Sequence, residues 1–97
     1  MITTKQRAYL RSLANGIPSI LQVGKEGVTE ALIKNVDEAL DAREIVKVSV
    51  LETSPVSSKE AIELVMNGIR GCEAVQVIGR KFVVYKRNLK EPKIILP

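Results

Sequence analysis

The sequence predicts one α/β domain in which a four-stranded mixed sheet packs with three helices. Three observations support this fold class. Apolar residues recur at helical spacing in three segments. Four shorter segments are apolar or alternate between apolar and polar residues, and glycine or proline stands at most boundaries. The resulting order is α-β-α-β-α-β-β, and 97 residues correspond to a single domain.

The first helix and the first strand are delimited by residues that start or stop regular structure. Thr3 and Gln6 have the spacing of a capping box, so the helix is expected to run over about 4–14. Gly16 then ends it. The apolar segment SILQV, residues 19–23, is predicted to be a buried strand.

The two sides of this first helix differ in character. At ~100° per residue, Tyr9, Leu10 and Leu13 share one side and are expected to face the core. Arg7 and Arg11 lie one turn apart on the other side, where we expect solvent. The helix is therefore expected to present two guanidinium groups in a row.

The second helix is predicted over about 29–42, with Thr29 as its N-cap. Its apolar stripe consists of Leu32, Ile33, Val36 and Leu40. Residues 44–52 alternate, because valines at every second position face one way and polar residues face the other. We therefore expect a helix followed by a strand with one solvated face.

The third helix and a hairpin complete the fold. Ser57 and Glu60 repeat the capping-box spacing, and Gly71 is expected to end the helix. Its apolar stripe consists of Ala61, Leu64, Val65 and Ile69. Residues 73–78 and 82–86 are predicted strands joined by a glycine-led turn. Because this last pair is a hairpin, the sheet should be of mixed direction, in a packing of two or three layers.

The last residues, about 88–97, form a basic tail of the domain 1–97. The apolar segment Ile94-Ile95-Leu96 either docks on the domain or is too short to do so. No apolar run approaches the ~18 residues of a membrane-spanning helix, and the N-terminus lacks the apolar region of a signal peptide. We therefore expect a cytoplasmic protein without a membrane partner.

The absence of some residue types excludes several classes of site. The chain has no histidine and one cysteine, Cys72, so a zinc site of Cys and His type and an intramolecular disulfide are excluded. Cys72 is expected to pack as a small apolar residue. Asp37, Glu38 and Asp41 are best explained as the solvated face of a helix. We predict no metal, no cofactor and no enzyme, since no acid/base pair supports action on a phosphorylated ligand.

Charge is distributed unevenly along the chain. Residues 1–25 hold four basic side chains and no acidic one, residues 26–78 hold five basic and ten acidic ones, and residues 79–97 hold six basic and one acidic. If the two basic ends meet in space, the fold has one electropositive face, which suits nucleic acid or another anionic surface. The alternative is a solvated surface whose charges average out.

The loop Gly24-Lys25-Glu26-Gly27 joins the first strand to the second helix. Two glycines permit a tight turn with positive φ. They also clear side chains away, so that a phosphate could approach backbone amides at the helix start after Thr29. The spacing fits neither a P-loop nor a dinucleotide fingerprint, but it fits the Gly-x-x-Gly clamp of one class of RNA-binding module. Lys25 favours an anion and Glu26 disfavours it, so a structural turn and an anion site both stay open.

Aromatic residues are too few for an extensive base-stacking platform. The chain has Tyr9, Phe82 and Tyr85, and the last two fall on opposite faces of one strand. Arg7 and Arg11 could instead contact phosphates, which gives affinity independent of sequence. Recognition of backbone and shape is therefore favoured over reading of unstacked bases.

Several blocks of the sequence, in order, carry a family resemblance: TTKQRAYLRSLA, LQVGKEGVTEALI, ALDAREIVKVSV, VQVIGRKFVVYKR and KIILP. Over nearly its whole length the chain resembles the YhbY-like family, the stand-alone bacterial form of the CRM RNA-binding domain. The resemblance implies an α/β fold similar to the C-terminal domain of translation initiation factor three. It also implies binding of structured ribosomal RNA and association with precursors of the large ribosomal subunit. We accordingly expect a monomer that binds ribosomal RNA and not DNA.

The resemblance also implies site residues. The family's Gly-x-x-Gly loop falls on Gly24, Lys25, Glu26 and Gly27, ahead of the helix that Thr29 begins. The implied basic surface consists of Lys5, Arg7, Arg11, Arg80, Lys81 and Lys86. Related loops often carry a small or neutral residue where this chain has a glutamate. The alternative function is a protein-interaction module on the ribosome or on an assembly factor, with the acidic middle segment as its contact surface.

Overall fold

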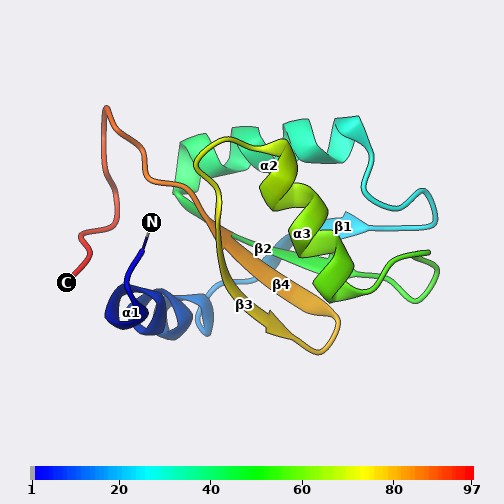
Figure 1. The fold of residues 1–97 in the computed structure, drawn as a ribbon, viewed down its shortest axis with the longest axis horizontal. Coiled ribbons are helices and arrows are strands. Elements are labelled where there is room, and N and C mark those ends of the chain that lie inside the picture. Colours follow the sequence, from blue (N-terminus) through cyan, green and yellow to red (C-terminus); the bar gives the residue numbers. More distant parts are fainter. Residues whose placement is uncertain (1) are drawn as a thin grey trace.

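A computed structural model describes residues 2–97, which form a four-stranded sheet in the order β1-β2-β4-β3 with three helices (Figure 1). The elements are α1 (Thr4–Ala14), β1 (Ser19–Val23), α2 (Glu30–Arg43), β2 (Ile45–Val50), α3 (Ser58–Gly68), β3 (Glu73–Ile78) and β4 (Lys81–Tyr85). β1 is parallel to β2, whereas β4 pairs antiparallel with both β2 and β3. The predicted element order and the mixed sheet are confirmed.

The helices cover both faces of the sheet, which gives three layers (Figure 1). α2 and α3 enclose the larger core, in which Val36, Val48 and Phe82 are fully buried. α1 encloses a smaller core on the opposite face, where Leu10 meets Val83. Phe82 and Val83 are adjacent in β4 but belong to different cores, because successive side chains of a strand point to opposite faces.

Each helix begins at the residue that the sequence predicts as its cap. Thr3 Oγ1 accepts a hydrogen bond from Gln6 N at 3.1 Å, and Ser57 Oγ accepts one from Glu60 N at 3.2 Å. Both are complete capping boxes, while Thr29 caps α2 with its hydroxyl alone. A cap of this kind contributes about 1 kcal/mol. The starts of these helices are thus determined locally.

Two predictions about core side chains are wrong. Tyr9 is 39% exposed, because α1 lies on the sheet through Leu10, so that the tyrosine falls at the margin of the contact. Leu64 is 44% exposed, and Ile62, with 4% exposure, packs in the larger core in its place. In both helices the predicted apolar stripe has the correct helical period. The buried side of the helix, however, is rotated by part of a turn from the predicted one.

Three predicted boundaries or environments also differ from the structure. β1 lies at an edge of the sheet, so that only Val23 of this strand is buried, although a buried strand was expected. α3 ends at Gly68 rather than near Gly71, which instead adopts a φ of 80° in the following turn. Lys81 belongs to β4 and not to the turn, because it pairs with Ile78.

The C-terminal tail docks on the domain. Ile94 and Leu96 pack against the smaller core, whereas Ile95 is 86% exposed. Glu44, the residue that ends α2, is fully buried, and its carboxylate accepts hydrogen bonds from the tail's backbone. The donors are the amides of Asn88, Lys93 and Ile94. The tail is therefore part of the folded domain, on the α1 side of the sheet.

The two chain ends lie close together beside α1 (Figure 1). Gln6 Nε2 of α1 donates a hydrogen bond to the carbonyl of Pro97 at 3.2 Å. Cys72 is half-buried against the larger core, as expected for a small apolar residue, and burial raises the pKa of its thiol to about 12. Within residues 2–97, no helix is long and apolar enough to cross a membrane.

Candidate functional site

The Gly24–Gly27 loop forms a tight turn at the end of β1. The amide of Gly27 donates to the carbonyl of Gly24 at 3.0 Å, and Gly27 has a φ of 72°, a conformation that favours glycine. Lys25 and Glu26 lie exposed at the tip, and within residues 2–97 neither joins an ion pair. The turn therefore orders the backbone while leaving its charged tip in solvent.

Helix α2 begins directly behind this turn. Thr29 Oγ1 accepts a hydrogen bond from Leu32 N at 3.0 Å. The preceding helical amides, those of Glu30 and Ala31, have no acceptor within the helix, because the first turn of any α-helix leaves its donors unpaired. The positive end of the helix dipole adds to their attraction for an anion. The helix start therefore presents oriented donors a few residues after the exposed Lys25.

Arg7 and Arg11 are held against the edge of the sheet. Arg7 Nε donates to the carbonyl of Ala74 at 3.0 Å, and Arg11 Nε donates to the carbonyl of Val75 at 3.1 Å. Both acceptors belong to β3, an edge strand whose outer carbonyls have no neighbouring strand. Each guanidinium uses one N–H in this way and keeps its terminal N–H groups for another partner. Arg11 is exposed, as expected, and Arg7 is half-buried, while the contacts of both with β3 were not predicted.

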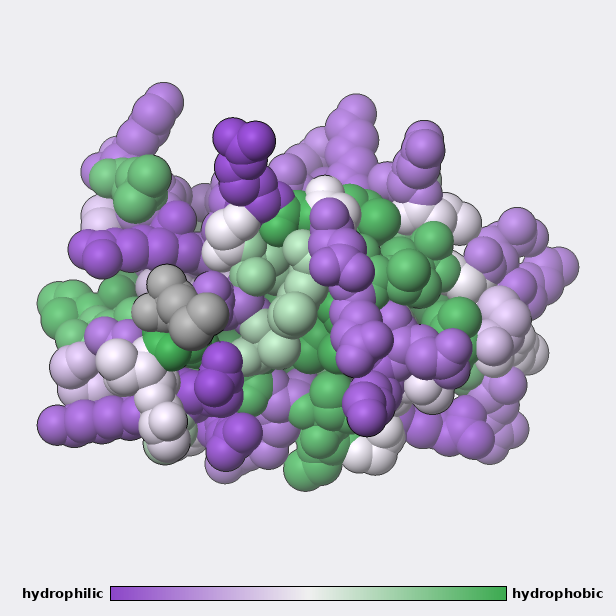
Figure 2. Space-filling model, in the orientation of Figure 1, coloured by the Kyte–Doolittle hydropathy of each residue, from purple (hydrophilic) through white to green (hydrophobic). Residues whose placement is uncertain are grey.

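The predicted basic residues do not form one compact cluster. The Gly24–Gly27 loop and α1 lie toward opposite ends of the long axis of the molecule, which extends 37 Å (Figure 1). Figure 2 shows hydrophilic side chains around much of the outline of this face, with hydrophobic ones between them in the middle and at the left and lower edges. Lys5 is exposed on α1, and Lys81 is exposed at the start of β4. The candidate surface is therefore elongated and runs from α1 along β3 toward the loop.

Arg80 lies between the two ends of this surface. Its backbone carbonyl accepts a hydrogen bond from Val50 N at 2.6 Å, which fixes the β3–β4 turn against the end of β2. Its guanidinium lies 3.9 Å from Glu52 Oε1, and both side chains are well exposed. An exposed pair of this kind is weak, so the guanidinium stays available to an anionic ligand.

Lys86 is separated from the other basic residues. Its Nζ lies 2.8 Å from Asp37 Oδ1 and 3.5 Å from Asp41 Oδ1, both on α2. The hydrogen bond to Asp37 raises the pKa of Lys86. Its charge is offset by two carboxylates on the acidic helix, and we therefore leave it out of the candidate surface.

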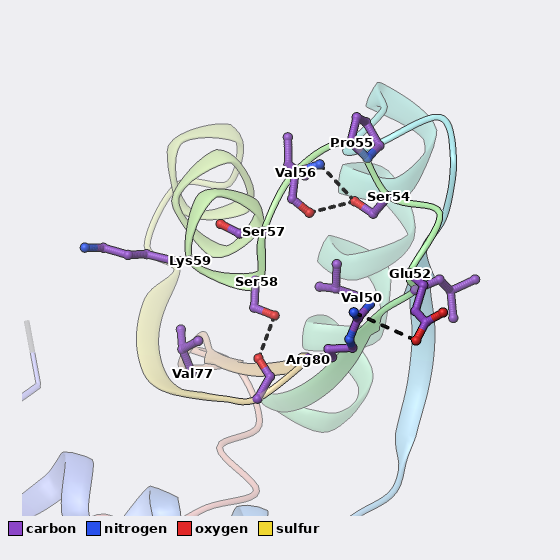
Figure 3. A pocket seen from close by; sticks show the side chains of 12 residues that line it. Val50, Glu52, Ser54, Pro55, Val56, Ser57, Ser58, Lys59, Val77 and Arg80 are labelled. Atoms are coloured by element: carbon purple, nitrogen blue, oxygen red, sulfur yellow. Dashed lines mark hydrogen bonds and ion pairs between the residues drawn. The ribbon is translucent and has the colours of Figure 1, made fainter.

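A groove adjoins the Gly24–Gly27 loop (Figure 3). Its volume is about 540 Å³, and its walls come from the β2–α3 loop, the start of α3 and the β3–β4 turn. A Cβ atom added to Gly27 would lie 3.3 Å from Pro55 Cγ, and one added to Gly24 would lie 3.9 Å from Leu51 Cδ1. Since Leu51 and Pro55 also line the groove, the loop and the groove share a wall.

This groove was not predicted from the sequence. Residues 53–58 had only the composition of a loop, and nothing in the sequence placed them beside Gly27 or Arg80. The one available signal was the proline at position 55, which restricts the loop backbone. The contact between the two loops arises because β1 and β2 are parallel neighbours, so that their C-terminal ends lie side by side.

The structure is an α/β domain with a glycine turn ahead of a helix start and two arginines along a sheet edge, and comparisons with known proteins define its class. The chain matches the model of the CRS1 / YhbY (CRM) domain over residues 2–86. It is 42% identical to the probable RNA-binding protein YqeI of Bacillus subtilis over 97 residues, which cover all of both chains. It is 33% identical to an RNA-binding protein of Haemophilus influenzae, with 99% of this chain and 95% of that protein covered.

A solved structure agrees with these relatives. The solution structure of a candidate RNA-binding protein from Staphylococcus aureus superposes with a TM-score of 0.82, at 43% identity over the whole of both chains. The chain therefore belongs to the CRS1 / YhbY (CRM) domain family, as its sequence blocks indicated.

Proposed function

We propose that this protein is a non-enzymatic RNA-binding protein that binds structured ribosomal RNA during assembly of the large ribosomal subunit. Relatives of similar length named as RNA-binding proteins support RNA as the ligand. The family resemblance supports the ribosomal target. The observation that carries the proposal is the Gly24–Gly27 turn, which leaves Lys25 exposed ahead of the α2 start, where the amides of Glu30 and Ala31 have no acceptor within the helix.

Binding would proceed in two stages. The basic side chains of α1 and the β3–β4 turn first attract the RNA and release its counterions. The phosphate backbone then approaches the exposed tip of the loop, and the amides at the start of α2 donate hydrogen bonds to it. Arg7 and Arg11 already have one N–H fixed on β3, so less freedom is lost when their remaining N–H groups contact phosphates.

The proposal is tested by titrating ribosomal RNA fragments at several salt concentrations. If four to six phosphates are neutralised, log K should fall against log salt with a slope of about −3 to −5, at ~0.7–0.9 per phosphate. Lys25→Glu and the double variant Arg7→Glu/Arg11→Glu should each weaken binding and flatten the slope. Unchanged affinity in both variants would overturn the proposal.

A further inference from the structure

We propose that the groove beside the Gly24–Gly27 loop receives one unpaired base of the bound RNA, with the Arg80 guanidinium as its stacking partner. This inference rests on the proposed function and adds a base-binding site to a phosphate-binding surface. The volume of about 540 Å³ lies within the ~300–1,000 Å³ typical of ligand pockets.

The position of the groove favours RNA as its occupant. Leu51 and Pro55 line the groove on one side and contact the Gly24–Gly27 loop on the other. A nucleotide whose phosphate is bound beside the loop would therefore lie next to the wall that the loop shares with the groove. A peptide ligand could use the same apolar walls, but it would leave the adjacent phosphate-binding amides unused.

The walls of the groove suit the flat face of a base. Val77 is 43% exposed and Leu51 is 39% exposed, so both present apolar surface that the fold leaves uncovered. The hydroxyl of Ser54 donates to the carbonyl of Val56 at 2.8 Å, and that of Ser58 donates to the carbonyl of Gly79 at 2.9 Å (Figure 3). Because these two hydroxyls donate within the protein, the polar groups left to a base are at the rim, on Glu52, Ser57 and Lys59, and stacking and shape should contribute most of the affinity.

Arg80 provides the planar group that the aromatic residues cannot provide. Phe82 and Tyr85 are buried in the two cores, and the structure places Tyr9 on α1, away from the groove. An arginine guanidinium stacks on unstacked bases as aromatic rings do. Glu52 Oε1 lies 3.9 Å from Arg80 Nη2, beyond hydrogen-bond distance, and both side chains are well exposed, so this weak contact does not occupy the guanidinium. Arg80 would thus stack on the base in addition to attracting the phosphates.

The test compares hairpin RNAs whose unpaired loops hold bases of one type each with the same hairpin carrying abasic riboses in the loop. All of these RNAs have the same number of phosphates. The wild-type protein should bind at least one base-containing loop about fivefold to a hundredfold more tightly than the abasic loop, the range expected for one stacked base. Arg80→Gln and Val77→Ala should reduce this ratio to near one.

Two matched variants separate base binding from general effects. Lys81→Gln removes the same charge as Arg80→Gln at the next position, outside the groove, and should weaken all of the hairpins equally. Ile78→Ala removes an exposed apolar side chain beside Val77, outside the groove, and should leave the ratio unchanged.

Each other outcome overturns a specific claim. Tight binding with equal affinity for base-containing and abasic loops would overturn the base site while leaving the proposed function intact, and the exposed apolar walls would then suit a protein partner. A base preference that survives in both Arg80→Gln and Val77→Ala would place the base elsewhere and also overturn the inference. Absence of binding to every hairpin would overturn the proposed function and this inference together.

Discussion

The buried carboxylate of Glu44 holds the backbone of Ile94, with 2.7 Å between Glu44 Oε1 and Ile94 N. The same oxygen accepts from the amide of Lys93, and Oε2 accepts from the amide of Asn88 at 2.8 Å. Glu44 is the one non-glycine residue with positive φ in residues 2–97, at 65°. A single acidic residue at the end of α2 thus ties the C-terminal tail to the sheet.

Replacement of Glu44 should destabilise the whole domain. Glu44→Ala leaves three amides without their acceptor, and each hydrogen bond to a charged group contributes about 1.5–3 kcal/mol. We expect the free energy of unfolding to fall by at least about 4 kcal/mol in a urea titration. Glu38→Ala, on the exposed side of the same helix, is the control and should change it by less than about 0.5 kcal/mol. Hydrogen exchange at Ile94 that stays as slow as in the wild type would contradict this role.

Substitution of the two loop glycines should affect stability and RNA binding separately. Gly27→Ala should cost about 1–2 kcal/mol of stability, because Gly27 has positive φ and the new Cβ would lie 3.3 Å from Pro55 Cγ. Gly24→Ala meets only an ordinary contact with Leu51 and should preserve stability, while its methyl group hinders the approach of a phosphate. Urea unfolding and RNA titration on both variants measure the two effects. If Gly24→Ala binds RNA as the wild type does, the loop is only a structural turn.

The α1 arginines should not be replaceable by lysines. Arg7→Lys/Arg11→Lys keeps both positive charges. A lysine ammonium, however, lacks the planar fork with which a guanidinium donates to a β3 carbonyl through Nε and to a phosphate through its terminal N–H groups. We expect weaker RNA binding with nearly the wild-type salt slope, and a loss of about 1 kcal/mol of stability for each hydrogen bond. Arg7→Gln/Arg11→Gln should instead flatten the slope by about 1.4–1.8. Wild-type affinity in the lysine variant would show that charge alone suffices.

Removal of Lys86 should have little effect on RNA binding. Lys86→Gln breaks the contacts with Asp37 and Asp41, and we expect a stability loss below about 1 kcal/mol and unchanged affinity, since two carboxylates already offset the charge. Lys81→Gln removes an exposed charge from the candidate surface and should flatten the salt slope by about 0.7–0.9. Parallel RNA titrations compare the two variants. Equal weakening by both would return Lys86 to the interface.

Stability should decline in alkaline solution. Burial raises the pKa of Cys72 from 9.0 to about 12, and the hydrogen bond to Asp37 raises the pKa of Lys86. Both groups bind protons more tightly when folded, so their contribution is complete below about pH 9 and is lost as the pH rises toward 12. Urea unfolding at a series of pH values should show this decline. Cys72→Ala should reduce it, and an identical decline in this variant would assign the effect to other groups.

Local sequence signals account for much of the secondary structure. Thr3, Thr29 and Ser57 each accept a hydrogen bond from an amide three residues further along the chain. The cap and the start of each helix can therefore be predicted from a few consecutive residues. The hairpin was likewise predicted from Gly79, whose φ is 56°. The rotation of the apolar stripes was not predicted, as Tyr9 and Leu64 show, because it depends on the angle at which each helix crosses the sheet.

By itself, the sequence determined the element order, the helix caps, the glycine turn and the supply of basic side chains, because each depends on neighbouring residues. Only the tertiary structure decided which charges act together. It placed Arg7 and Arg11 on the edge of β3, turned Lys86 toward α2 and brought Pro55 against Gly27. Such contacts join residues far apart in the chain, and they follow from strand order and helix packing rather than from any local pattern.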